Sequence, residues 1–130
     1  MTPGRWSRYS SRMTPIIGWR KLRPGRSTVP RFTVWPVITE AAYFLRHDSR
    51  AIGLLLREIE RGNLTVMEVR PEDTPRISEL ISKYSDLPMD YTDAALVVCC
   101  ERLAITTVFT FDRNFSIYRP SHAARFETIP

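Results

Sequence analysis

Residues 86–119, DLPMDYTDAALVVCCERLAITTVFTFDRNFSIYR, decide the fold of this chain. Asp93 precedes the apolar run Ala94–Cys100, and such a run is typical of a buried helix. The segment Ile105–Thr110 has few polar groups, as expected for a strand that is covered on both faces. Asp112 follows that strand by two residues. A buried helix that leads into a buried strand predicts an α/β unit, with one acid at the start of the helix and another after the strand.

Apolar periodicity extends this pattern in both directions from the central segment. Four helices are expected from the i, i+3, i+4 spacing of apolar residues, and three strands from short β-branched runs. The expected helices are 36–46, 50–61, 74–85 and 91–103, and the expected strands are 64–69, 105–110 and a short last one at 126–129. Alternating helices and strands predict an α/β fold in which 64–69 and 105–110 belong to one parallel sheet.

Composition limits the class of protein. The chain has 130 residues, which is enough for one domain with a single core. Its apolar fraction of 43% and charged fraction of 25% are ordinary for a globular protein, and no apolar run is long enough to span a membrane. The two cysteines, Cys99 and Cys100, are neighbours on an expected helix, so we interpret them as core thiols in a reducing cytoplasm.

Charge divides the chain at about residue 31. Residues 1–31 hold eight of the 19 basic residues and none of the 14 acids, so residues 32–130 carry 11 basic and 14 acidic residues, a net charge of −3. The first segment also lacks an apolar period of either kind. We therefore expect two parts, a basic irregular head at 1–31 and a folded domain at 32–130.

Three acids lie on three different expected elements: Glu40, Asp93 and Asp112. Ligands of open α/β sheets bind beyond the carboxyl ends of the strands, where Asp112 falls. Converging carboxylates repel one another unless they bind a cation, and Mg²⁺ prefers oxygen ligands. Each acid also has a plainer explanation. Asp112 suits a turn, Asp93 suits the first turn of a helix, where Asp90 is the expected cap, and Glu40 suits a solvated helix edge.

Local motifs around these acids resemble the PIN-domain ribonucleases, in particular toxins of the VapC type. Asp93 begins Asp-Ala-x-Leu-Val, Asp112 lies in Thr-x-Asp-x-x-Phe, and Glu40 lies in Thr-Glu-Ala. The resemblance covers about residues 32–119. It implies a three-layer fold with helices on a parallel sheet, and it implies that Glu40, Asp93 and Asp112 are catalytic residues that bind Mg²⁺ or Mn²⁺.

The same resemblance implies a function. It predicts a metal-dependent endoribonuclease, the toxin of a toxin–antitoxin pair, that cleaves RNA in the cytoplasm, forms a homodimer and binds an antitoxin protein. Arg113 and Asn114 are the expected substrate contacts, although many relatives carry a further aspartate where this chain has Asn114. Two alternatives stay open: an impaired PIN remnant that keeps its dimer or antitoxin surface, and a basic RNA-binding module that depends on the head alone.

The head departs from the family pattern, which places a first aspartate at the end of a central strand near the N-terminus. A shift of the reading frame offers one explanation. Taking the last base of each codon with the first two of the next, Met1–Thr2 and Met13–Thr14 each give aspartate, and the first nine shifted codons can read Asp-Thr-Gly-Pro-Leu-Val-Ala-Leu-Leu. The other explanation is a disordered basic arm. In either case we expect a missing central strand, an incomplete sheet and impaired activity.

Overall fold

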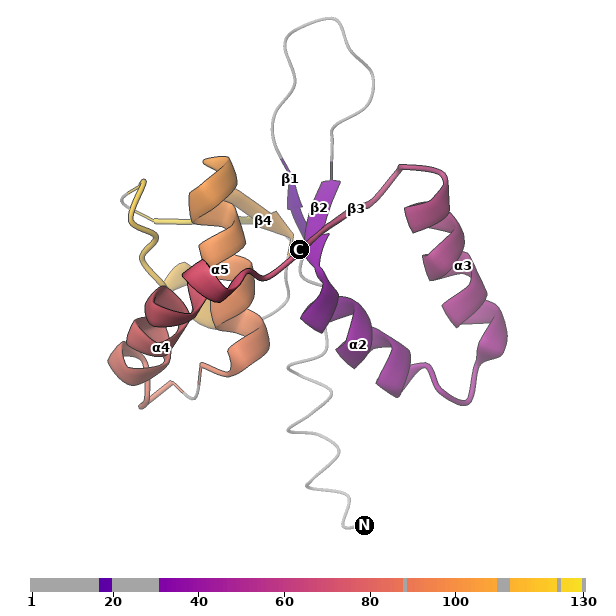
Figure 1. Ribbon diagram of the computed structural model, residues 1–130, viewed down its shortest axis with the longest axis horizontal. Helices are drawn as coiled ribbons and strands as arrows, with labels where there is room; N and C mark the ends of the chain where they lie inside the picture. The colour runs from indigo at the N-terminus through magenta and orange to yellow at the C-terminus, as the bar shows by residue number, and fades with distance from the viewer. Residues whose placement is uncertain (1–16, 20–30, 88, 110–112, 124, 130) are drawn as a thin grey trace, which may run out of the picture.

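The computed structural model describes residues 17–19, 31–87, 89–109, 113–123 and 125–129 (Figure 1). Helices and strands are interspersed along these residues. In chain order they are β1 (Ile17–Trp19), β2 (Arg31–Val34), α2 (Trp35–Phe44), α3 (Ser49–Glu60), β3 (Thr65–Met67), the 3₁₀ helix η1 (Pro71–Asp73), α4 (Thr74–Lys83), α5 (Tyr91–Leu103), β4 (Thr107–Phe109), the 3₁₀ helix η2 (Arg113–Ser116) and β5 (Glu127–Ile129). The predicted α/β class is confirmed, and each predicted helix is present within two residues of its predicted ends.

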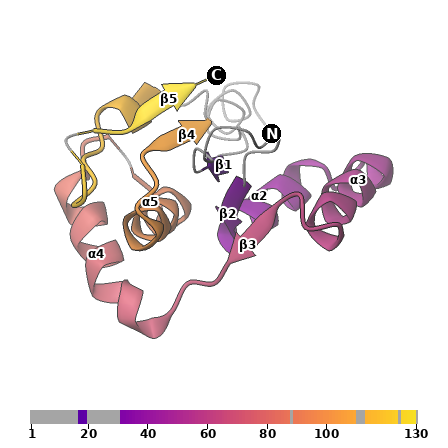
Figure 2. The same cartoon turned by 90° about the horizontal axis from the view of Figure 1, so that it is seen from above.

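Five strands form one sheet in the order β3-β2-β1-β4-β5 (Figure 2). β2 and β3 are parallel, β4 and β5 are parallel, and β1 is antiparallel to both of its neighbours, β2 and β4. It follows that β2, β3, β4 and β5 all run in one direction. The predicted parallel relation between β3 and β4 is therefore confirmed, whereas β2 was not predicted from the sequence.

The expectation of an incomplete sheet was wrong. β1 comes from the basic head and lies between β2 and β4, where Gly18 is opposite Phe32 on one side and Val108 on the other. β2 and β4 would otherwise present unpaired backbone groups to each other across a gap, and almost any extended segment can satisfy them. The strand that fills the gap has three residues and runs against the other four.

Helix α5 lies at the centre of the fold. Its residues from Thr92 to Cys100 are all buried, and those from Ala94 onward are apolar on every side of the helix, as a buried helix requires. The carboxylate of Asp90 accepts a hydrogen bond of 2.9 Å from the backbone N–H of Asp93, so the predicted cap is confirmed. The helix ends at Ala104, which has a φ angle of 54°.

The core is formed by α4, α5, β2, β4 and the segment around η2. Its most deeply buried large side chains include Leu80, Val97, Val108, Phe115 and Tyr118. Both cysteines are buried and free, as predicted. Among the described residues, no helix is both long and apolar enough to cross a membrane.

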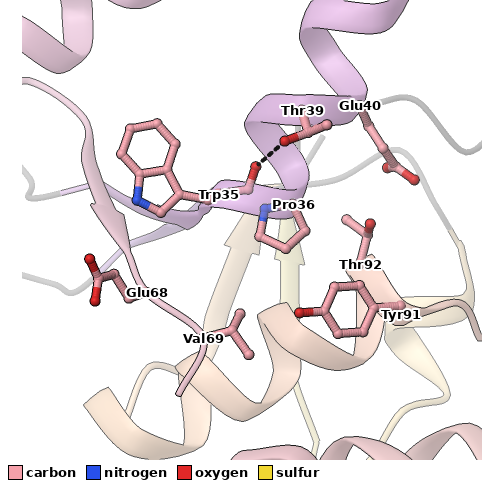
Figure 3. Close-up of a pocket in the computed structure, with 8 residues that line it drawn as sticks. All are labelled: Trp35, Pro36, Thr39, Glu40, Glu68, Val69, Tyr91 and Thr92. Carbon is pink, nitrogen blue, oxygen red and sulfur yellow. Dashed lines mark hydrogen bonds between the residues drawn. The ribbon is translucent and has the colours of Figure 1, made fainter. Parts of the chain in front are cut away.

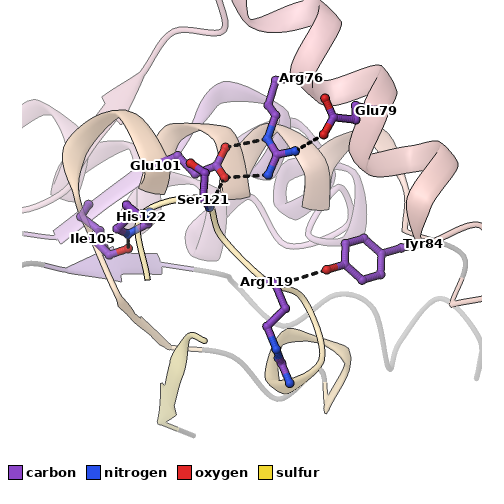
Figure 4. Close-up of polar contacts among 8 residues, drawn as sticks. All are labelled: Arg76, Glu79, Tyr84, Glu101, Ile105, Arg119, Ser121 and His122. Carbon is purple, nitrogen blue, oxygen red and sulfur yellow. Dashed lines mark hydrogen bonds and ion pairs between the residues drawn. The ribbon is translucent and has the colours of Figure 1, made fainter. Parts of the chain in front are cut away.

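Polar contacts fasten α4 to α5 at the edge of this core (Figure 4). The guanidinium of Arg76 donates two hydrogen bonds to the carboxylate of Glu101, of 3.0 and 2.9 Å. The backbone N–H of Ser121 donates a third, of 2.5 Å. Tyr84 accepts a hydrogen bond from the backbone N–H of Arg119 at 2.9 Å, which ties the end of α4 to the segment after η2.

Candidate functional site

The carboxyl ends of the parallel strands bring distant segments together. β2 continues directly into α2, and β3 is followed by Glu68 and Val69. Helix α5 leads back into β4, so its N-terminus lies at the same edge of the sheet. Because ligands of α/β sheets bind at this edge, the residues that begin α2 and α5 are candidates for a binding site.

A cavity of about 580 Å³ lies at this edge (Figure 3). Three segments line it: the first turns of α2, the residues after β3 and the start of α5. The lining residues are Trp35, Pro36, Thr39, Glu40, Glu68, Val69, Tyr91 and Thr92. Its volume is within the range of about 300–1,000 Å³ that small-ligand sites occupy.

Glu40 is placed at this cavity by the second turn of α2. It is half-buried, and Figure 3 shows its carboxylate pointing from α2 toward the side of the cavity where Thr92 lies. The preceding residue, Thr39, donates its hydroxyl to the carbonyl of Trp35 at 3.1 Å, as threonines inside helices commonly do. Glu40 therefore lies at the rim of the cavity, and its predicted role as a metal ligand stays a prediction.

Asp93 lies one residue beyond the cavity-lining Thr92. It is only 8% exposed, and it belongs to the first turn of α5. A helix N-terminus stabilises a carboxylate through the partial positive charge of its free N–H groups. A carboxylate buried to this degree also favours a cation or hydrogen-bond donors nearby. The start of α5 thus brings a buried acid to the edge where Glu40 lies.

The other predicted site residues are less fully described. Asp112 lies outside the described residues, three positions after the last residue of β4. Arg113 begins η2, and its side chain is also outside what the structure describes. The side-chain amide of Asn114 donates a hydrogen bond of 3.2 Å to the carbonyl of Leu87, so it helps to hold η2 against the loop before α5. The roles of these three residues stay predictions.

The donor groups of the side chains at the cavity edge decide whether a metal ion fits there. Within the described ranges, no group of three or more His, Cys, Asp or Glu side chains is arranged to hold a metal ion. Glu40 and Asp93 nonetheless supply carboxylate oxygens, and Mg²⁺ typically takes only one or two carboxylates directly. The chemistry of these two donors fits a hard divalent cation.

Sequence reasoning missed Glu68, Trp35 and Tyr91, which also line the cavity. Glu68 directly follows β3, but it falls inside the strand predicted at 64–69, so the sequence did not place it at the end of a strand. Trp35 is 45% exposed and Tyr91 is 49% exposed. Each is the first residue of a helix and has apolar residues nearby in the sequence. The sequence therefore does not distinguish these two exposed aromatic side chains from aromatic side chains of the core.

Comparison with known proteins gives the class of this protein. Residues 23–119 match the PIN domain family model, and the chain belongs to the PIN-domain family. Over 77 residues it is 32% identical to "Ribonuclease VapC26" of Mycobacterium tuberculosis, an alignment that covers 58% of this chain. The chain spans 57% of the length of that curated relative. The family match ends at residue 119, where the predicted resemblance also ends, and it begins nine residues earlier than the predicted start at 32.

Proposed function

We propose that this chain is an endoribonuclease of the PIN class that hydrolyses RNA phosphodiester bonds with Mg²⁺ or Mn²⁺, and that its activity is impaired in the present sequence. The observation that carries the proposal is the meeting of Glu40 and the start of α5, with buried Asp93, at one edge of the sheet. Family membership supports the reaction class, and the named relative is a ribonuclease.

Glu40, Asp93 and Asp112 are the proposed ligands. When bound, a divalent ion would lower the pKa of a bound water and neutralise charge on the scissile phosphate. The protein's own contribution is position and shielding. Asp93 is held by a helix whose cap, Asp90, is half-buried and whose residues 94–100 are all buried, so its carboxylate has little freedom to move. Glu40 faces the open cavity, through which RNA would approach.

Impairment is proposed because the central strand brings no acid. Residues 1–39 contain neither Asp nor Glu, so β1 has none to offer in whichever direction it runs. β1 is also antiparallel to its neighbours, which differs from a parallel strand that would end at the cavity edge. These observations support the hypothesis that the head is read in a shifted frame and that the in-frame head would supply the first aspartate.

Partners are part of the proposal. We expect a homodimer in the cytoplasm and an antitoxin protein that occupies the cavity edge, as in a toxin–antitoxin pair. Helix α3 supports a protein contact because it contains no buried residue while Leu54 and Leu56 are more than half exposed. The same surface favours the second candidate function, a PIN remnant that binds an antitoxin without cleaving RNA.

A side-by-side assay tests the proposal. The present chain is compared with a version whose first 31 codons are read in the shifted frame, using a labelled single-stranded RNA with Mg²⁺, with Mn²⁺ and with EDTA. The shifted version is expected to cleave at least about a hundredfold faster, because small misplacements at a reacting centre have effects of that size.

Two variants of the shifted version are the controls. Asp93→Asn should abolish its cleavage, and Asp90→Asn should retain most of it, because Asp90 caps the helix and asparagine is an equally good cap. Equal, EDTA-sensitive cleavage by the present chain and the shifted version would refute the impairment. Metal-independent cleavage by either would refute the mechanism.

A further inference from the structure

Two exposed aromatic side chains flank the cavity without a role in the proposed metal site. Trp35 and Tyr91 are each nearly half exposed, although residues adjacent to both in the chain are buried or half-buried. In Figure 3 the indole of Trp35 and the ring of Tyr91 lie on either side of Pro36. Large aromatics left open to solvent at the mouth of a cavity have flat surfaces available for a planar ligand.

We infer that Trp35 and Tyr91 form a stacking site for one unpaired base of single-stranded RNA next to the proposed cleavage site. The inference rests on the proposed function for its substrate class and adds the part of the RNA that the cavity recognises. Base–aromatic stacking is the common way in which proteins hold single strands, because every base offers a π face.

The other lining residues suit a base better than a phosphate. Glu40 and Glu68 make the cavity acidic, which disfavours a bare phosphate, and the carboxylate of Glu68 can accept from the amino group of a neutral base. Glu68 is exposed and is not among the proposed metal ligands. Trp35 and Tyr91 are the first residues of helices α2 and α5. The partial positive charge at the N-terminus of each helix favours an anionic RNA backbone just outside the cavity.

The geometry selects single strands. A base inside a duplex has both faces stacked on its neighbours and its edge paired, so it cannot enter a cavity between two side chains without being unstacked. The cavity of about 580 Å³ is large enough for one base with its sugar. Duplex RNA should therefore be a poor ligand at this position.

Binding in the absence of cleavage tests the inference. The full chain is titrated with a fluorescently labelled short oligoadenylate in EDTA, which keeps the RNA intact, and anisotropy gives the Kd. Trp35→Ala and Tyr91→Ala are each expected to raise the Kd by about 5- to 150-fold, the range for loss of one base–aromatic stack. Trp35→Phe should retain most of the affinity, since phenylalanine keeps a stacking face.

Tyr43→Ala is the matched control. Tyr43 is 56% exposed and lies on the same helix as Trp35, but it does not line the cavity, so its removal should change the Kd less than twofold. The basic head is common to all variants, and its phosphate contacts cancel in the comparison. Thermal melting by circular dichroism checks that each variant is folded.

Each other outcome has a definite meaning. Unchanged affinity in folded Trp35→Ala and Tyr91→Ala would overturn the inference and leave the cavity to a protein partner, while the proposed cleavage would be unaffected. Equal affinity for an RNA duplex would overturn it as well. Stacking-dependent binding together with no cleavage by the shifted-frame version would support the inference and refute the catalytic proposal. No RNA binding at all would refute the inference and the proposed substrate together.

Discussion

The two halves of the sheet are stabilised to different degrees. The half that contains β4 and β5 is accompanied by α4, α5 and η2, and these elements hold most of the buried core side chains, while α5 also packs against β2 and α2. The half that contains β2 and β3 is accompanied by α2 and α3 (Figure 1). None of the residues of α3 is buried. β1 joins the two halves. The difference teaches that most of the core side chains come from residues 77–126, whereas α3, in the other half, has little cover.

The sequence of α3 explains its part in this difference. Ile52, Leu55 and Ile59 form an apolar stripe at helical spacing, yet each of them is only half-buried. A stripe of this kind is normally covered by another element or another chain.

The largest effect is expected from removing a core side chain in the β4–β5 half. Phe115 is fully buried and contacts the rings of Tyr118 and Phe126. Phe115→Ala should lower the free energy of unfolding by about 3–5 kcal/mol. Leu54→Ser on α3 should change it by less than about 0.5 kcal/mol, because Leu54 is 55% exposed. Urea unfolding followed by circular dichroism measures both, and similar losses would remove the distinction between the halves.

A matched pair of helix caps sharpens the comparison. Asp48 caps α3 by accepting from Ala51 N–H at 3.0 Å, and Asp90 caps α5 by accepting from Asp93 N–H at 2.9 Å. The local loss on substitution by alanine is about 1 kcal/mol in each case. Asp90→Ala should lower global stability by that amount, since α5 is the centre of the core. Asp48→Ala should only fray α3.

Hydrogen exchange separates the two outcomes for the caps. Asp48→Ala should speed exchange of the amides of α3 and leave those of α5 unchanged, because local opening involves only the weakly packed element. Asp90→Ala should speed exchange throughout the molecule. A global loss of stability in Asp48→Ala would mean that α3 unfolds together with the core.

Much of this arrangement could be predicted from the sequence. The helix at 91–103 was predicted with the bounds that α5 has, because its apolar run, its capping aspartate and the preceding proline all agree. β2 was missed because it has four residues, begins with a basic residue of the head and leads straight into a helix. β1 was missed because its pairing depends on the open edges of β2 and β4, which are tertiary features.

The candidate site, too, could be predicted from the sequence only in part. Glu40 and Asp93 were predicted as site residues from local motifs, and the structure brings the segments that carry them to one edge. Their role as ligands stays a prediction. Trp35, Tyr91 and Glu68 could not be found in the sequence, because a cavity forms only where three separate segments meet. How exposed each of these side chains is depends on how the three segments pack together, and not on the local sequence pattern.

A smaller, pH-dependent effect is expected in the β4–β5 half. Burial raises the pKa of Glu101, but hydrogen bonds from Arg76 and Ser121 more than offset this, so its pKa in the folded protein is lower than the ordinary value. A lowered pKa in the folded state stabilises the protein above the unfolded-state pKa, and this contribution is lost as pH falls through the folded-state pKa. Glu101→Gln should therefore be less stable than wild type at pH 7, with a difference that shrinks in acid.

Glu79→Gln is the control for that pH dependence. Glu79 also pairs with Arg76, at 2.6 Å, but its side chain is 65% exposed against 10% for Glu101. Exposed pairs contribute little, so the stability of this variant should follow that of wild type at each pH. Urea unfolding between neutral pH and about pH 3 measures both variants. A stability difference for Glu101→Gln that does not change with pH would contradict the lowered pKa.

The smallest expected effect is the reaction of the two thiols with an external reagent. Cys99 and Cys100 are buried in α5, and burial raises the pKa of Cys99 to about 11 and that of Cys100 further. Only the thiolate reacts, and at pH 8 a pKa of about 11 leaves on the order of one thiol in a thousand ionised. Ellman's reagent should therefore modify the folded protein only as fast as α5 is exposed by global unfolding, and it should modify both cysteines at once in urea. Phe115→Ala should speed this reaction and Asp48→Ala should not, because the second change opens only α3. Rapid modification of the folded wild-type protein would show that α5 opens locally, and the β4–β5 half would then be no more stable than its neighbour.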